Sequence, residues 1–110
     1  MKKLKILIID RSPIIFIGLK SIFKNSVIFE VLACIDNKKE IEQTIIKDKI
    51  DFVISEIDFV DGNVTDILKI LKKYKIEIPL VVFTSKENEN KSINLLKLGA
   101  SGFLTKDLKK

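Results

Sequence analysis

The sequence contains little cysteine and no long apolar run. Cys34 is the only cysteine among 110 residues, so no disulfide can form within the chain, as is typical of a reducing compartment. No apolar stretch approaches the roughly 18 residues that a membrane-spanning helix needs. The apolar segment after Met1 reaches Asp10 within a few residues and has no small-residue cleavage site, which favours a buried strand over a secretion signal. These absences predict a cytoplasmic protein with no membrane partner.

Arginine is also scarce, although the net charge is +5. Arg11 is the only arginine, and the lysines are spread along the whole chain among Asp and Glu residues. Arginine is the preferred side chain for reading base edges, and a base-stacking platform needs interleaved aromatic residues. We therefore expect no direct nucleic-acid contact by this domain, and we interpret the lysines as a solvated surface.

What is present is a regular alternation of short apolar runs and helical patterns. The length and the 46% hydrophobic content are typical of one globular domain over residues 1–110. The apolar runs predict five strands, at residues 4–9, 28–35, 52–55, 80–84 and 101–105. Between them, four helices are predicted to begin at Ser12-Pro13, at Asn37 with Glu40, at Asn63, and near Asn90, the last ending at Gly99.

This element order predicts a doubly wound α/β fold. Right-handed crossovers give a five-stranded parallel sheet of flavodoxin-like order 2-1-3-4-5. Ligands of such sheets bind at the carboxyl ends of the strands, near the point where the strand order reverses. The residues selected by this rule are Asp10, Arg11, Glu56, Asp58, Thr84, Ser85 and Lys106.

One helix of the expected sheet is truncated or missing. The residues after Lys106 are too few for a helix of ordinary length, so half of one sheet face is predicted to be bare. We expect the chain to be the N-terminal part of a longer regulator. The alternative is that a partner chain covers this face.

Three segments carry motifs at the ends of the first, third and fifth predicted strands. They are residues 4–10 followed by Ser12-Pro13 and Gly18-Leu19, residues 51–56, and residues 99–107 with the sequence GASGFLTKD. Together they resemble the receiver domain of bacterial response regulators of the NarL/LuxR type, and the resemblance covers the whole chain. It implies two-component (phosphorelay) signal transduction, transcription regulation, a downstream DNA-binding domain and a homodimer.

The resemblance also assigns the pocket residues. In such receivers two adjacent acids bind Mg²⁺ together with an aspartate that accepts the phosphoryl group. Asp10 matches the first acid, Arg11 stands in place of the second, and Glu56 stands in place of the acceptor aspartate. The positions of the phosphoryl-sensing hydroxyl, the switch aromatic and the pocket lysine are matched by Thr84, Phe103 and Lys106.

These departures indicate an atypical receiver with a degenerate phosphorylation pocket. Arg11 removes an anionic ligand and adds a cation, so Mg²⁺ binding is predicted to be lost and no cofactor is expected. Glu56 carries its carboxylate one methylene farther out, and a misplacement of about 1 Å can cost roughly 100-fold in rate. We expect Arg11 and Lys106 to reach Glu56 instead. The pocket is then either active-like or an inert plug.

Plainer interpretations stand beside several of these assignments. Cys34 and Phe103 are also typical core residues, and Asp58 and Asp61 are typical turn residues. A weak metal site using Asp10 and Asp58 is a minor alternative.

Three classes of function remain. The leading hypothesis is a regulatory domain with no enzymatic activity that acts through dimerisation and without phosphorylation. The second is a receiver that accepts phosphate from a histidine kinase. The third, a flavodoxin-like nucleotide or flavin binder, needs a phosphate-binding loop after the first strand, which Arg11-Ser12-Pro13 does not provide.

Overall fold

Five parallel strands form one sheet through the middle of the molecule, in a computed structural model that describes residues 2–106. The strands are β1 (Leu4–Ile9), β2 (Phe29–Ile35), β3 (Phe52–Ser55), β6 (Leu80–Thr84) and β7 (Gly102–Thr105). They pair in the order β2-β1-β3-β6-β7, which confirms the predicted order of the first to the fifth strand. Their Ile, Val and Leu content suits a parallel sheet, because such sheets are buried between layers.

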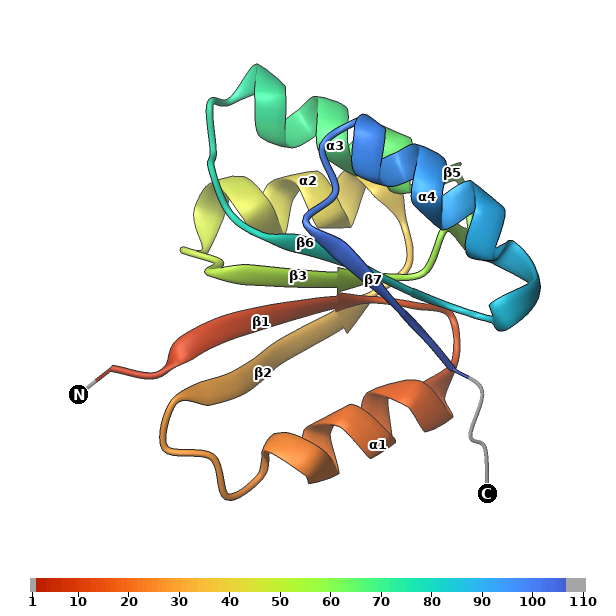
Figure 1. The fold of residues 1–110 in the computed structure, drawn as a ribbon. Helices are drawn as coiled ribbons and strands as arrows, with labels where there is room; N and C mark the ends of the chain where they lie inside the picture. Colours follow the sequence, from red (N-terminus) through yellow and green to blue (C-terminus); the bar gives the residue numbers. More distant parts are fainter. Residues whose placement is uncertain (1, 107–110) are drawn as a thin grey trace.

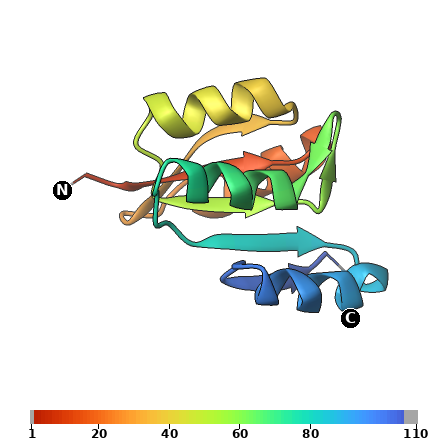
Figure 2. The ribbon, with the colours of Figure 1, turned by 90° about the horizontal axis from the view of Figure 1, so that it is seen from above.

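Four helices cover this sheet unequally. α1 (Pro13–Phe23) lies on one face, and the other face carries α2 (Lys38–Lys47), α3 (Val64–Lys73) and α4 (Glu89–Lys97), as Figure 1 shows. Seen from above, α2, α3 and α4 follow one another across the sheet (Figure 2). A short 3₁₀ helix, Lys86–Asn88, precedes α4. None of the described helices combines the length and apolar character that crossing a bilayer requires.

Local sequence signals set the helix ends. Polar side chains accept hydrogen bonds from backbone amides of the first turn at the start of three helices: Ser12 from Ile15 (3.4 Å), Asn37 from Glu40 (2.9 Å) and Asn63 from Thr65 (2.9 Å). These bonds satisfy amide groups that have no partner inside the helix. Gly99 has a φ of +119°, a conformation that favours glycine, just after the end of α4. The predicted capping residues are therefore confirmed, but the full capping box forms at Asn63 with Asp66 and not at Asn37 with Glu40.

A small hairpin follows β3 where the sequence predicts only a turn. β4 (Asp58–Phe59) and β5 (Gly62–Asn63) pair antiparallel around the expected Asp61-Gly62 turn. Two-residue strands are too short to show an alternation of apolar and polar residues, so the sequence carries no periodic signal for them. Phe59 is buried in the core and holds this hairpin against the domain.

The apolar core is divided by the sheet into a large and a small cluster. The large cluster lies between the sheet and α2, α3 and α4, and includes Leu7, Val53 and Ile67. The small cluster has only three buried members, Ile6, Ile8 and Ile54. No residue of α1 is buried, so this helix covers its face only partly.

The predicted bare half of that face is observed in the described part of the chain. Over residues 2–106, α1 is the only helix on this side. Beside it lies a hollow of about 170 Å³ lined by seven apolar side chains, among them Phe23, Phe52 and Leu104. The motif residue Asp107 lies outside the described residues.

Candidate functional site

The strand ends bring three charged residues to one point of the sheet edge. Asp10 follows β1, Glu56 follows β3 and Lys106 follows β7. The backbone amide of Glu56 donates to the carbonyl of Ile9 (2.8 Å), and that of Lys106 donates to the carbonyl of Thr84 (2.8 Å). These bonds continue the sheet ladder by one step, so the strands themselves position the side chains.

Lys106 joins the two carboxylates. Its Nζ lies 2.7 Å from Asp10 Oδ2 and 3.1 Å from Glu56 Oε1. The remaining oxygens accept backbone hydrogen bonds, Asp10 Oδ1 from Ser12 (2.9 Å) and Glu56 Oε2 from Ile57 (2.7 Å). Every carboxylate oxygen of the pair therefore has a partner. We call Asp10, Glu56 and Lys106 the ion-pair cluster.

The ion-pair cluster is largely removed from water. The side chains of Asp10, Lys106 and Glu56 are 6%, 21% and 23% exposed. Burial on its own lowers the pKa of Lys106, but the hydrogen bonds and charges of Asp10 and Glu56 together outweigh burial and leave this pKa above its ordinary value. Lys106 is therefore fully charged at neutral pH. Its ammonium group also lies 5.6 Å from the centre of the Phe83 ring.

Arg11 does not join the cluster as expected. Its side chain is exposed, and among residues 2–106 it forms no ion pair with Glu56 or any other carboxylate. It lines an open hollow of about 400 Å³ together with Asp10, Glu56, Asp58 and Asn88. The guanidinium thus stays at the rim, while Lys106 reaches Glu56 from the end of β7, across the intervening strand β6.

Thr84 and Phe103 have their contacts outside the ion-pair cluster. Thr84 is fully buried, and its Oγ1 accepts a hydrogen bond from Asn88 Nδ2 (3.0 Å). Sequence reasoning missed Asn88, since an asparagine four residues after a strand carries no signal of this contact. Phe103 is half-buried and packs against the large core cluster. Ser85 lies beside them, and its Oγ also accepts from Asn88 (3.4 Å).

The remaining candidates have structural partners. Asp61 Oδ1 accepts from the amide of Lys38 (2.7 Å) at the start of α2, and Asp58 is an exposed member of the hairpin. Burial and the nearby Asp10 charge raise the pKa of the Cys34 thiol, whose Sγ lies 3.5 Å from the Asp10 carbonyl oxygen. Cys34 packs against the small core cluster, as a small core residue does. Among residues 2–106, no three His, Cys, Asp or Glu side chains are grouped as a metal site requires.

Comparison with known proteins gives the family to which this fold belongs. The family model of the response regulator receiver domain matches residues 6–110. The nitrate/nitrite response regulator protein homolog of Haemophilus influenzae is 28% identical over 105 residues, which are 96% of this chain and 50% of that protein. The chain therefore spans about half the length of this relative.

Solved structures agree with this class at the level of the fold. Full-length FixJ from B. japonicum superposes with a TM-score of 0.85 at 21% identity, covering 99% of this chain and 53% of FixJ. The RcsB response regulator of Salmonella typhimurium, described for its DNA interaction, gives 0.81 at 17% identity over 94% of this chain and 54% of RcsB. The chain belongs to the response regulator receiver domain family. Receiver domains are in general signalling domains and not enzymes.

Proposed function

We propose that this chain is an atypical receiver domain that is not switched by phosphotransfer. The observation that carries the proposal is Lys106 bridging Asp10 and Glu56, with glutamate in the place of the acceptor aspartate. The pocket that serves phosphorylation in other receivers then acts here as a fixed ion pair. The domain performs no catalysis in this account.

The donor set fits Mg²⁺ poorly. Mg²⁺ requires a strict octahedron of hard oxygen ligands, and carboxylates supply the negative charge. Here one oxygen of Asp10 and one of Glu56 already bind the Lys106 ammonium, while their second oxygens accept backbone amides. Arg11 adds a further cation at the rim. We therefore assign no Mg²⁺ and no phosphoryl transfer to this pocket.

The sensing hydroxyl is also engaged. Thr84 Oγ1 accepts from Asn88 in a fully buried position, so this oxygen is held by the protein itself. This hydrogen bond supports a pocket whose side chains keep one fixed arrangement and do not switch between two. It agrees with the fixed ion pair on the neighbouring strand ends.

The output that we propose is control of a DNA-binding transcription regulator in the cytoplasm through homodimerisation. Two observations support the DNA-binding output, while the homodimer is the mode of control that we propose for it. The chain matches only about half of the curated response regulator from Haemophilus influenzae, which leaves room for a second domain. RcsB, described for its DNA interaction, shares the fold and is likewise about twice as long. Sedimentation velocity of the 110-residue chain tests the dimer directly, and a monomer at all concentrations would contradict it.

A phosphotransfer-competent receiver is the second candidate, because Asp10, Thr84 and Lys106 keep the residue types of the family pocket. A titration with Mg²⁺ and beryllofluoride, followed by two-dimensional NMR, separates the two candidates. We expect the amide signals of Glu56, Ile57 and Lys106 to stay unshifted. Saturable shifts at these three amides would show a working phosphorylation pocket and would overturn the proposal.

A further inference from the structure

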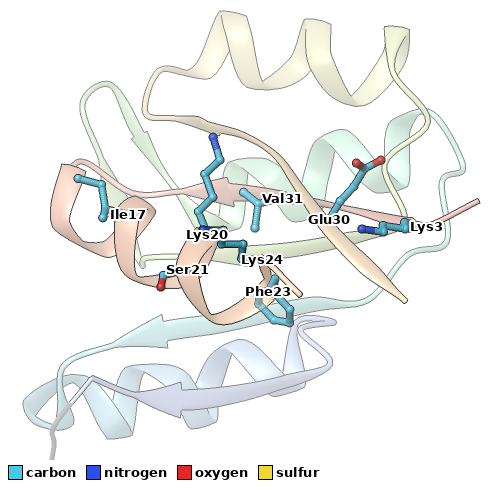
Figure 3. Close-up of a pocket in the computed structure, with 8 residues that line it drawn as sticks. All are labelled: Lys3, Ile17, Lys20, Ser21, Phe23, Lys24, Glu30 and Val31. Atoms are coloured by element: carbon cyan, nitrogen blue, oxygen red, sulfur yellow. The ribbon is translucent and has the colours of Figure 1, made fainter. Parts of the chain in front are cut away.

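Lysines that are dispersed in the sequence meet in space at the amino end of the sheet. The first of two hollows there has a volume of about 540 Å³ and lies between α1 and β2. Figure 3 shows the lysines that line it: Lys20 from α1, Lys24 directly after α1, and Lys3 from the segment before β1. Glu30 of β2 is the one acid of this hollow.

The second hollow adjoins the first, since Lys3 lines both. It has a volume of about 400 Å³ and contains the lysines Lys2, Lys3, Lys5, Lys47 and Lys49. Its acids are Asp48 and Asp51, and Asp51 Oδ2 already accepts the backbone amide of Lys5 (2.8 Å). We call the lysines of the two hollows the basic end.

Topology explains why these residues meet. In a parallel sheet with helical crossovers every helix runs back against the strands, so the carboxyl ends of α1 and α2 lie where β1 begins (Figure 1). Lysine in the last turn suits the negative end of the helix dipole, which accounts for Lys20 and Lys47. It does not account for Lys2, Lys3 and Lys5, which come from no helix.

The positive charge of the basic end is not neutralised within the described chain. Seven lysines face three acids across the two hollows. Over residues 2–106, the observed salt bridges involve Lys73 and Lys106 only. The opposite end of the sheet holds the ion-pair cluster with the acids Asp58 and Asp61. Over residues 2–106, the basic end is therefore strongly positive and lies at the end of the sheet opposite the ion-pair cluster.

We propose that the basic end binds the phosphate backbone of double-stranded nucleic acid, independently of sequence. Phosphate contacts need point charges, which lysine supplies, and they need no arginine fork or aromatic platform. The scarcity of arginine thus excludes base reading but not backbone binding, which revises the expectation that this domain makes no nucleic-acid contact. The presence of a DNA-binding domain that brings the phosphate backbone close to the basic end rests on the proposed function. Binding of the basic end to the duplex does not depend on that function.

The test measures binding of the 110-residue chain to a labelled duplex of about 20 base pairs by fluorescence anisotropy. Each neutralised phosphate contributes about −0.9 to the slope of log affinity against log salt concentration. Substituting Lys3, Lys24, Lys47 and Lys49 together by Gln is expected to weaken binding at low salt by at least about tenfold and to reduce the slope by about 3 to 4. Substituting the same four lysines by arginine keeps the positive charge, and this variant is expected to bind the duplex like the wild type.

The matched control replaces Lys38, Lys39, Lys86 and Lys91 by Gln. Both glutamine sets lower the net charge from +5 to +1, because each removes four positive charges. The control is expected to bind within about twofold of the wild type, since its lysines lie outside the two hollows. Equal losses in both sets would reduce the effect to net charge and overturn the proposal. The proposal would also be overturned if the chain did not bind the duplex, or if it bound phosphatidylserine vesicles and not the duplex.

Discussion

At the end of β7, a single ammonium group serves two carboxylates. Lys106 binds Asp10 at 2.7 Å and Glu56 at 3.1 Å, so the cluster keeps one net negative charge. Backbone amides at Ser12 and Ile57 take the other oxygens, which spreads this charge over four hydrogen bonds. Hydrogen-bond and ion-pair partners of this kind offset the free-energy cost of burying a charge. The cluster therefore depends on Lys106 more than on any other side chain.

Replacement of Lys106 by methionine is expected to lower the free energy of unfolding by about 1–3 kcal/mol, because it leaves the Asp10 carboxylate buried without its cation. The value is below that of a fully buried pair, since Glu56 is partly solvated. Urea unfolding measures it. Lys86→Met, at an exposed position, is the control and is expected to stay within about 0.5 kcal/mol of the wild type. A loss no larger than that of the control would contradict this role.

The charge of Lys106 also fixes a pH dependence. Its pKa is raised above the ordinary 10.5, because the Asp10 and Glu56 contacts outweigh the lowering by burial. A raised folded-state pKa contributes stability that is fully present below the unfolded-state pKa and is lost as the pH rises through the folded-state pKa. The stability difference between the wild type and Lys106→Met is thus expected to be constant from about pH 7 to 9.5 and to shrink above about 10.5. Shrinkage already below about pH 9 would refute this assignment.

At the scale of elements, the sequence predicts those features that depend on neighbouring residues. Ser12, Asn37 and Asn63 were found as helix caps because a cap bonds within its own first turn. The hairpin of β4 and β5 was missed because its strands are two residues long.

The candidate site likewise has features that the sequence predicts and features that it does not. The convergence of Asp10, Glu56 and Lys106 follows from strand order, which the sequence predicts. The outward position of Arg11 and the bond from Asn88 to Thr84 depend on side-chain rotamers that no sequence pattern specifies. The gathering of lysines at the basic end was not predicted, because the rule applied to the sequence selects residues at the carboxyl ends of the strands, and the basic end lies at their amino ends.

Two glycines in different elements give opposite predictions. Gly18 lies inside α1, where an added Cβ meets nothing within 4 Å, so Gly18→Ala is expected to stabilise the protein by about 0.5–1 kcal/mol. Gly99 has a φ of +119° after α4, and Gly99→Ala is expected to destabilise by about 1 kcal/mol or more. Urea unfolding of both variants checks the pair. A stabilised Gly99→Ala protein would show that this helix end relaxes.

At the scale of the whole molecule, the two faces of the sheet differ. α2, α3 and α4 cover one face and build the large cluster, whereas α1 covers the other face partly. The resulting hollow of about 170 Å³ has an apolar lining, and Leu104 at its edge is 59% exposed. Exposed apolar areas of this kind commonly mark a binding surface. Over residues 2–106 the protein therefore presents an apolar area on the α1 side of the sheet.

An apolar fluorescent dye is expected to bind this hollow in the folded chain. Leu104→Lys places a charge at its edge and is expected to reduce the dye fluorescence at least about twofold. Leu98→Lys is the matched control, because Leu98 is 61% exposed but lies outside the hollow. Equal dye fluorescence from the two variants would show that the dye does not bind in this hollow.

Intact-mass measurement after incubation with acetyl phosphate and Mg²⁺ tests the central claim most directly. The wild-type chain is expected to show no phosphoryl adduct, because Arg11 stands in place of an acid and Glu56 stands in place of the shorter acceptor aspartate. The double variant Arg11→Asp, Glu56→Asp restores the acid pair and the shorter acceptor, and it is expected to gain an adduct under the same conditions. A stoichiometric adduct on the wild-type chain that disappears in Glu56→Gln would contradict the account.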